Sequence, residues 1–263
     1  MFLHELKAYG KSTMVWSASL VLLIVFFLSF FPSIANEAAE FKKILANYPE
    51  PVRKAFGLSI DTISSLLGFY AYAFSYILLC GSIQAMNLGI SVLSKETREK
   101  TADFLLTKPV TRNEVITAKL AAALASLMIT NIIYVAAAAA TASAVSEKAV
   151  DMNIFILISL TAFLVELMFL ALGIFIAVIV PKIKSVLSLS LSIVFAFFII
   201  NMFGSVIGEK AIRYITPFKY YDTAYIMKHS GYETSFLIIE GLFIIIAIVA
   251  SYFIYSKKDI HTV

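Results

Sequence analysis

The sequence has 263 residues, of which 60% are hydrophobic and only 14% are charged. A soluble domain carries about a quarter charged residues, so this composition excludes an ordinary globular protein and indicates an integral membrane protein. The net charge of +4 would favour a nucleic-acid partner for a soluble protein, but here orientation in the bilayer accounts for the basic residues better. Cys80 is the single cysteine, so a disulfide within the chain is excluded, and it lies in an apolar run.

The N-terminal region predicts a surface helix followed by a first span. Residues 1–11 place apolar side chains at helical spacing, a pattern typical of an amphipathic helix on the cytoplasmic membrane surface. Residues 14–31 are long enough to cross a hydrocarbon core of about 30 Å. A signal peptide is the alternative, but this run exceeds the usual apolar region of about 7–15 residues. Because further spans also follow, we interpret it as an uncleaved span.

Residues 32–61 form the longest polar segment and are expected on the outer side of the membrane. Asn36 is predicted to cap an amphipathic helix that ends before Pro49 and Pro51. The apolar stripe of that helix consists of Phe41, Ile44, Leu45 and Tyr48. We expect this helix to rest on the outer membrane face. A role in substrate gating is the alternative, and the position of the helix is its only support.

Five further spans are predicted at residues 62–93, 120–145, 152–180, 185–207 and 236–255. The first of these contains no charge, and as one helix it would be about 50 Å long, so it must tilt, kink or protrude. Within it Gly81, Ala85 and Gly89 recur every four residues. Such small residues allow close helix packing, either in this chain or with a partner chain. Residues 120–145 are rich in alanine, which favours packing over a pore-lining role.

Six spans place both termini on the same side of the membrane. That side carries more of the lysine and arginine residues, and they lie in short loops and beside span ends, where they determine orientation. The sequence therefore predicts an all-α membrane protein with cytoplasmic N- and C-termini. Residues 94–119 are then cytoplasmic, whereas residues 32–61 and 208–235 form outer segments.

Residues 94–119 are a polar segment between two spans, with clear signals for two helices. Pro109 lacks an N–H and ends the first helix, because it also disfavours the helical conformation of the residue before it. Thr111 and Glu114 have the spacing of a capping box, which starts the second helix. This pattern predicts a rigid helix–turn–helix that projects from the membrane; a well-formed cytoplasmic loop is the alternative.

Motifs for nucleotide or metal chemistry are missing from the sequence. Neither GxxxxGK[ST] nor GxGxxG occurs, so we do not expect the chain to bind ATP by itself. His4, His229 and His261 are far apart and do not have metal-ligand spacing. We therefore expect neither a bound cofactor or metal nor a catalytic site in this chain.

Glu166 is interpreted as the one ionisable residue deep within a span. Such residues often belong to ion or proton pathways, which makes Glu166 a candidate intramembrane functional residue. The alternative is structural, with a protonated carboxyl group hydrogen-bonded to a neighbouring helix. Polar amides inside the spans, among them Gln84 and Asn131, are expected to form interhelical hydrogen bonds.

The polar segment at 94–119 resembles the cytoplasmic signature of ABC type-2 permeases, the membrane subunits of exporters related to bacitracin-resistance and sodium-export systems. The matching residues are Glu96, Thr101, Leu105, Leu106, Pro109, Val110, Thr111, Arg112, Val115, Ile116 and Lys119. Lys100 departs from the family, which usually has glycine there. Two further matches are the start of the chain, with Glu5, Leu6, Lys7 and Trp16, and an outer segment with Thr216, Pro217, Phe218 and Tyr220.

The resemblance implies that residues 1–263 form a single permease domain in a prokaryotic cell membrane. Two such chains, identical or different, would form the pathway, and each would dock on a separate ATPase that binds ATP and magnesium. Residues 94–119 would hold the coupling helix, with Phe104 either inserted into the ATPase or lying on the membrane. The implied contact residues are Glu96, Thr101, Phe104, Leu105, Leu106, Pro109 and Arg112.

Two alternatives to an exporter permease are retained. A non-transporting scaffold or immunity protein would have nearly the same fold without dependence on ATP. An intramembrane enzyme built around Glu166 would need a second polar catalytic group at the same depth. The substrate is not specified by any motif in the sequence.

Overall fold

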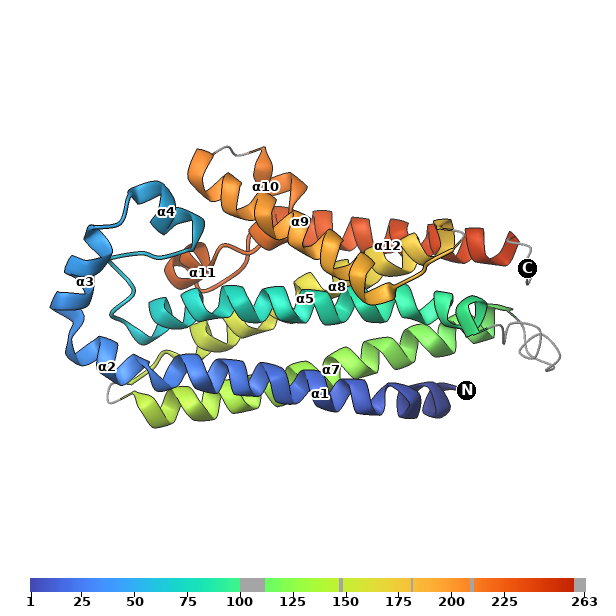
Figure 1. Cartoon of the computed structure of the whole chain (residues 1–263), viewed down its shortest axis with the longest axis horizontal. Helices are drawn as coiled ribbons and strands as arrows, with labels where there is room; N and C mark the ends of the chain where they lie inside the picture. Colours follow the sequence, from blue (N-terminus) through green and yellow to red (C-terminus); the bar gives the residue numbers. More distant parts are fainter. Residues whose placement is uncertain (100–111, 147–148, 181, 209–210, 258–263) are drawn as a thin grey trace.

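The computed structural model describes residues 1–99, 112–146, 149–180, 182–208 and 211–257, with the backbone alone for residues 95–99, 112 and 257. Every regular element within these ranges is a helix (Figure 1). Six of the helices are long and apolar enough to cross a membrane. The prediction of an all-α, six-span membrane protein is therefore confirmed.

The spanning helices run side by side along the long axis of the molecule (Figure 1). They are α1 (Phe2–Ser29), α5 (Leu66–Glu99), α7 (Arg112–Val145), α8 (Met152–Ile179), α9 (Val186–Ile207) and α12 (Thr234–Lys257). The start of α1 and the end of α12 lie at the end of the bundle where α5 ends and α7 begins, and α2, α3 and α4 lie at the other end. Following the charge distribution, we name these the cytoplasmic end and the outer end.

The outer end is built from short helices on two segments. The first segment forms α2 (Phe31–Asn36), α3 (Ala38–Ala46) and α4 (Glu50–Ala55), and the second forms α10 (Ile212–Ile215), η1 (Pro217–Lys219) and α11 (Thr223–His229). The prediction that Asn36 caps a helix is wrong, because a proline near the start of α2 begins that helix directly after α1 and Asn36 becomes its last residue. Of the predicted apolar stripe, Leu45 is buried whereas Ile44 and Tyr48 are exposed.

The expected boundary between a surface helix at residues 1–11 and a first span is absent. The chain is helical from Phe2 to Ser29 without a break. One buried stripe follows the whole helix, and it includes Glu5, Tyr9 and Thr13 as well as the apolar residues further on. Because Thr13 lies 2.5 Å from Ser126 of α7, the first turns pack against the bundle and do not form a separate surface helix.

Two helix pairs form the centre of the bundle. α5 makes its most extensive contacts with α8, and α1 makes its most extensive contacts with α7. α9 and α12 pack at the periphery, and most of their surface is exposed in this chain. The contacts between the two pairs are smaller than those within each pair. The molecule is therefore divided into an α1–α7 pair and an α5–α8 pair.

Candidate functional site

Most of the predicted ATPase-contact residues lie outside the described residues. These are Thr101, Phe104, Leu105, Leu106 and Pro109. Glu96 belongs to the last turns of α5, and Arg112 is the first residue of α7. The predicted segment therefore connects the cytoplasmic ends of α5 and α7, and the contacts of its side chains stay predictions.

The base of this segment is clamped by a buried lysine. Lys119 of α7 is fully buried, and its Nζ donates a hydrogen bond to the Val92 carbonyl oxygen of α5 at 2.9 Å. Val115 and Ile116, one turn earlier on α7, are buried as well. A hydrogen bond from a charged donor is stronger than one between neutral groups, so it holds the two helices together where they leave the bundle.

In the sequence, Lys119 was counted as a cytoplasmic charge and as part of the family signature, and its burial was not predicted. The signal that could have identified its burial is helical spacing, because Lys119 follows Val115 by four residues and Ile116 by three, and therefore lies on their apolar face.

The small-residue face of α5 packs against α8. A Cβ atom added at Gly89 would lie 3.0 Å from the Gly173 Cα atom, and one added at Gly81 would lie 3.1 Å from the Glu166 Cδ atom and closer still to its Oε1. Ala85, between these glycines, is completely buried. The partner of this face is thus a helix of the same chain, and α5 and α8 approach as closely as their backbones allow.

Hydrogen bonds between side chains cross from α7 to the α5–α8 pair. Gln84 Nε2 donates to Thr130 Oγ1 at 2.9 Å, Asn131 Nδ2 donates to Glu166 Oε2 at 2.5 Å, and the hydroxyl groups of Tyr70 and Tyr134 lie 2.5 Å apart. These six residues are all buried, and we call them the polar seam. The expected interhelical hydrogen bonds of Gln84 and Asn131 are confirmed.

Glu166 lies at the centre of the polar seam. Its Oε2 accepts the hydrogen bond from Asn131, whereas its Oε1 faces Gly81 and has no hydrogen-bond partner in the described part of the chain. The sequence could not identify Asn131 as the partner, because 35 residues separate the two positions and their pairing depends on how α7 and α8 align.

Glu166, expected as the one ionisable residue deep within a span, is not the only buried carboxyl group of the spanning helices. Glu240 of α12 is also buried, and it accepts a hydrogen bond from the Tyr221 hydroxyl group of the outer segment. The sequence predicted the sixth span from residue 236, which placed Glu240 one turn inside it, so its position was a signal that could have been used. This contact fixes the outer segment to α12.

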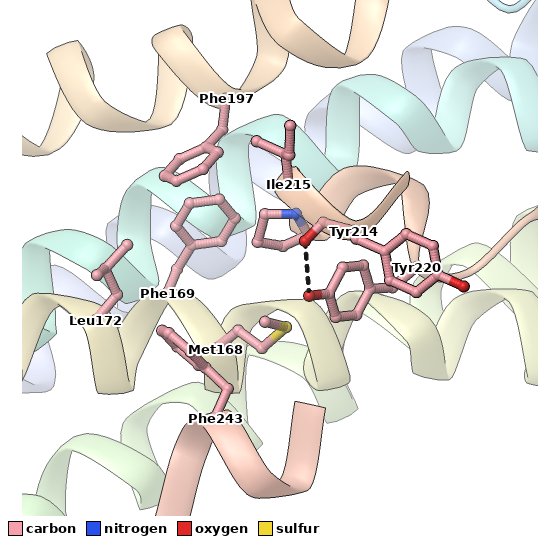
Figure 2. Close-up of a pocket in the computed structure, with 9 residues that line it drawn as sticks. Met168, Phe169, Leu172, Phe197, Tyr214, Ile215, Tyr220 and Phe243 are labelled. Atoms are coloured by element: carbon pink, nitrogen blue, oxygen red, sulfur yellow. Dashed lines mark hydrogen bonds between the residues drawn. The ribbon is translucent and has the colours of Figure 1, made fainter. Parts of the chain in front are cut away.

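A cavity of about 160 Å³ lies beside the middle of α8 (Figure 2). Its lining residues come from α8, α9, α12 and the outer segment and are Met168, Phe169, Leu172, Phe197, Tyr214, Ile215, Pro217, Tyr220 and Phe243. The Tyr220 hydroxyl group donates to the Tyr214 carbonyl oxygen at 3.4 Å, as Figure 2 shows. Apart from that contact, the wall offers mainly aromatic and aliphatic surface.

The model of the ABC-2 family transporter proteins matches residues 1–260. The chain belongs to this family. Family membership and the six apolar helices together make it the permease component of an ABC transporter, a multi-pass membrane protein whose family relies on ATPase activity in another subunit. No curated protein matches the sequence. Groups of three or more residues able to hold a metal ion do not occur in the described ranges.

Proposed function

We propose that the chain is one permease subunit of an exporter, and that a separate ATP-binding-cassette subunit docks on residues 94–119. That partner would bind ATP and magnesium. The observation that carries this proposal is the clamp between Lys119 and Val92, which makes the attachment of the segment to α5 and α7 rigid. A force applied to residues 100–111 would then move the two helices instead of being lost in a slack connection.

Transmission into the membrane follows from the length of the two helices. α5 and α7 each contain 34 residues, so each is about 50 Å long and reaches through the bilayer core. α5 would carry α8 with it, and α7 would carry α1, because those contacts are the most extensive. The polar seam lies between the two moving pairs, and its hydrogen bonds can exchange partners as the pairs shift.

The finer assignments follow from the family resemblance. We infer that a second permease chain, identical or different, completes the pathway, and that the complex lies in a prokaryotic cell membrane. Large exposed side chains of α9 and α12, such as Phe203 and Phe253, provide apolar surface for lipid or for that second chain. Within the family, the bacitracin-resistance and sodium-export permeases are the proposed relatives in function.

Copurification from native membranes tests the partner. The chain should capture a protein that mass spectrometry identifies by its nucleotide-binding motifs, and Glu96→Ala together with Arg112→Ala should reduce capture and transport by roughly tenfold, the effect of losing a charged contact. The matched control is Glu50→Ala with Lys54→Ala, which removes an exposed ion pair at the outer end. Equal loss in both variants, or no such protein even after mild cross-linking, would refute the proposal.

A further inference from the structure

The segment after α9 returns toward the membrane centre. α9 ends at Ile207, yet the Thr216 hydroxyl group donates to the Phe197 carbonyl oxygen at 3.1 Å. Ten residues of α9 separate Phe197 from Ile207, so Thr216 lies about 15 Å back along the helix. η1 and the residues around it therefore form one wall of the cavity at the depth of lipid acyl chains.

The cavity suits an apolar chain. Met168 and Phe169 of α8 form its fully buried wall, whereas Tyr214 and Ile215 are exposed at its rim. The rings of Phe169 and Phe197 meet edge to face with their centroids 5.9 Å apart, and Figure 2 shows both on the same side of the cavity. Its volume of about 160 Å³ is many times the roughly 10–15 Å³ that one water-sized probe needs, so the cavity can hold part of an acyl chain.

A positive charge lies further out along α9, on η1. Lys219, the last residue of η1, is half-buried, and its Nζ donates to Ser205 Oγ of α9 at 2.7 Å. It forms no ion pair with a carboxylate of the described residues, whereas its neighbour Arg213 is paired with Glu233 at 2.6 Å. A half-buried ammonium group whose hydrogen-bond partner is a hydroxyl group retains capacity for an anion.

The distance between charge and cavity matches one lipid molecule. Ser205 is eight residues beyond Phe197 on α9, so the Lys219 ammonium lies about 12 Å outward from the level of the cavity. Half of a hydrocarbon core of about 30 Å is about 15 Å. A headgroup phosphate at Lys219 would therefore leave the acyl chain of the same molecule at the height of Phe197 and Phe169.

We propose that this region binds a phospholipid of the outer leaflet, with its anionic headgroup at Lys219 and one acyl chain in the cavity. The site uses only residues of this chain and is independent of the ATPase. Failure of the lipid test would leave the proposed coupling intact, and failure of ATPase capture would leave the lipid site intact.

Native mass spectrometry of the purified full chain tests the site with two lipids of equal acyl length, phosphatidylglycerol and phosphatidylcholine. The unmodified chain should retain phosphatidylglycerol roughly tenfold better, because both lipids carry a phosphate but only phosphatidylcholine has a choline cation that repels the Lys219 ammonium group. Lys219→Ala should remove this preference. Leu172→Trp, which fills the cavity, should reduce retention of both lipids severalfold, and Leu172→Phe serves the same purpose if the first variant does not fold.

Lys228→Ala is the matched control, since Lys228 is a lysine of the same outer segment but is exposed on α11, whereas Lys219 is half-buried beside α9. It should retain both lipids as the unmodified chain does. Inorganic phosphate alone should not displace the lipid, because it lacks the acyl chain. Equal retention of the two lipids by the unmodified chain, or a preference that survives Lys219→Ala, would overturn the proposal. So would Leu172→Trp dissociating a dimer without changing lipid retention, which would assign the cavity to a second copy.

Discussion

Replacing Gly81 by alanine should destabilise the contact between α5 and α8. The added Cβ atom would meet the Glu166 carboxyl group, with its Cδ only 3.1 Å away. Glu166 is buried and hydrogen-bonded to Asn131, so it cannot move aside freely. Overfilling a packed interior costs about 1–3 kcal/mol, whereas glycine to alanine in an unobstructed helix gains about 1 kcal/mol. We expect Gly81→Ala to lower the free energy of unfolding by about 1–2 kcal/mol.

A double-mutant cycle attributes that cost to Glu166. Glu166→Ala vacates the space, so Gly81→Ala should then be neutral or stabilising, with an interaction energy of about 1–3 kcal/mol. Gly241→Ala is the control, because nothing lies within 4 Å of a Cβ atom at that position of α12. Unfolding by sodium dodecyl sulfate in mixed micelles, followed by circular dichroism, provides the measurement. Equal effects of Gly81→Ala with and without Glu166 would refute the reasoning.

Three other variants test the remaining contacts. Lys119→Met removes the donor to Val92 and should cost about 1.5–3 kcal/mol in the same unfolding assay; unchanged stability would contradict a structural clamp. Glu166→Gln keeps an acceptor for Asn131, so the free energy of unfolding should change by less than about 1.5 kcal/mol and transport should persist. Lost transport in a folded variant would instead indicate an ion or proton pathway. Burial lowers the pKa of Lys219, with nearby Asp222 opposing this shift and Arg213 adding to it, so the charge is lost, as pH rises, before that of an exposed lysine. The preference for anionic lipid should decline over the same range in a pH series of lipid retention, and a preference that persists until exposed lysines titrate would contradict this assignment.

The six spans were predictable because apolar runs of membrane length with at most one charged residue are rare in soluble domains. The continuity of α1 could not be predicted in the same way, although Gly10 and Lys11 are compatible with a helix. A polar N-terminal stretch indicates a surface helix when it is considered alone. The first turns of α1 pack against the bundle because the Thr13 hydroxyl group forms a hydrogen bond with Ser126 of α7. This contact depends on the alignment of two helices, and its two residues are 113 positions apart in the sequence.

At the candidate site, too, the sequence indicated residues that pack closely but did not identify the helices that they contact. The spacing of Gly81, Ala85 and Gly89 predicted close packing, but it did not identify α8 as the partner. Gly173, the reciprocal glycine on α8, has only Ala177 at the same four-residue spacing, a shorter pattern than that of α5. Likewise, the position of Glu240 inside an apolar run marks it in the sequence, but its partner Tyr221 is identified only by the fold of the outer segment.

The contact between α5 and α8 and the polar seam differ in chemistry, and this difference indicates where the helices can shift. Within the α5–α8 pair, glycine backbones touch, and separating them would open a void that no side chain can fill. Across the polar seam, each contact is a hydrogen bond between flexible side chains, and each donor or acceptor could pair again after a small shift. Closely packed surfaces resist sliding, whereas exchangeable hydrogen bonds permit it. A movement of the two pairs that keeps the hydrogen bond between Lys119 and Val92 would therefore be absorbed further along the helices at the polar seam, where the hydrogen bond between Asn131 and Glu166 would have to tilt or break.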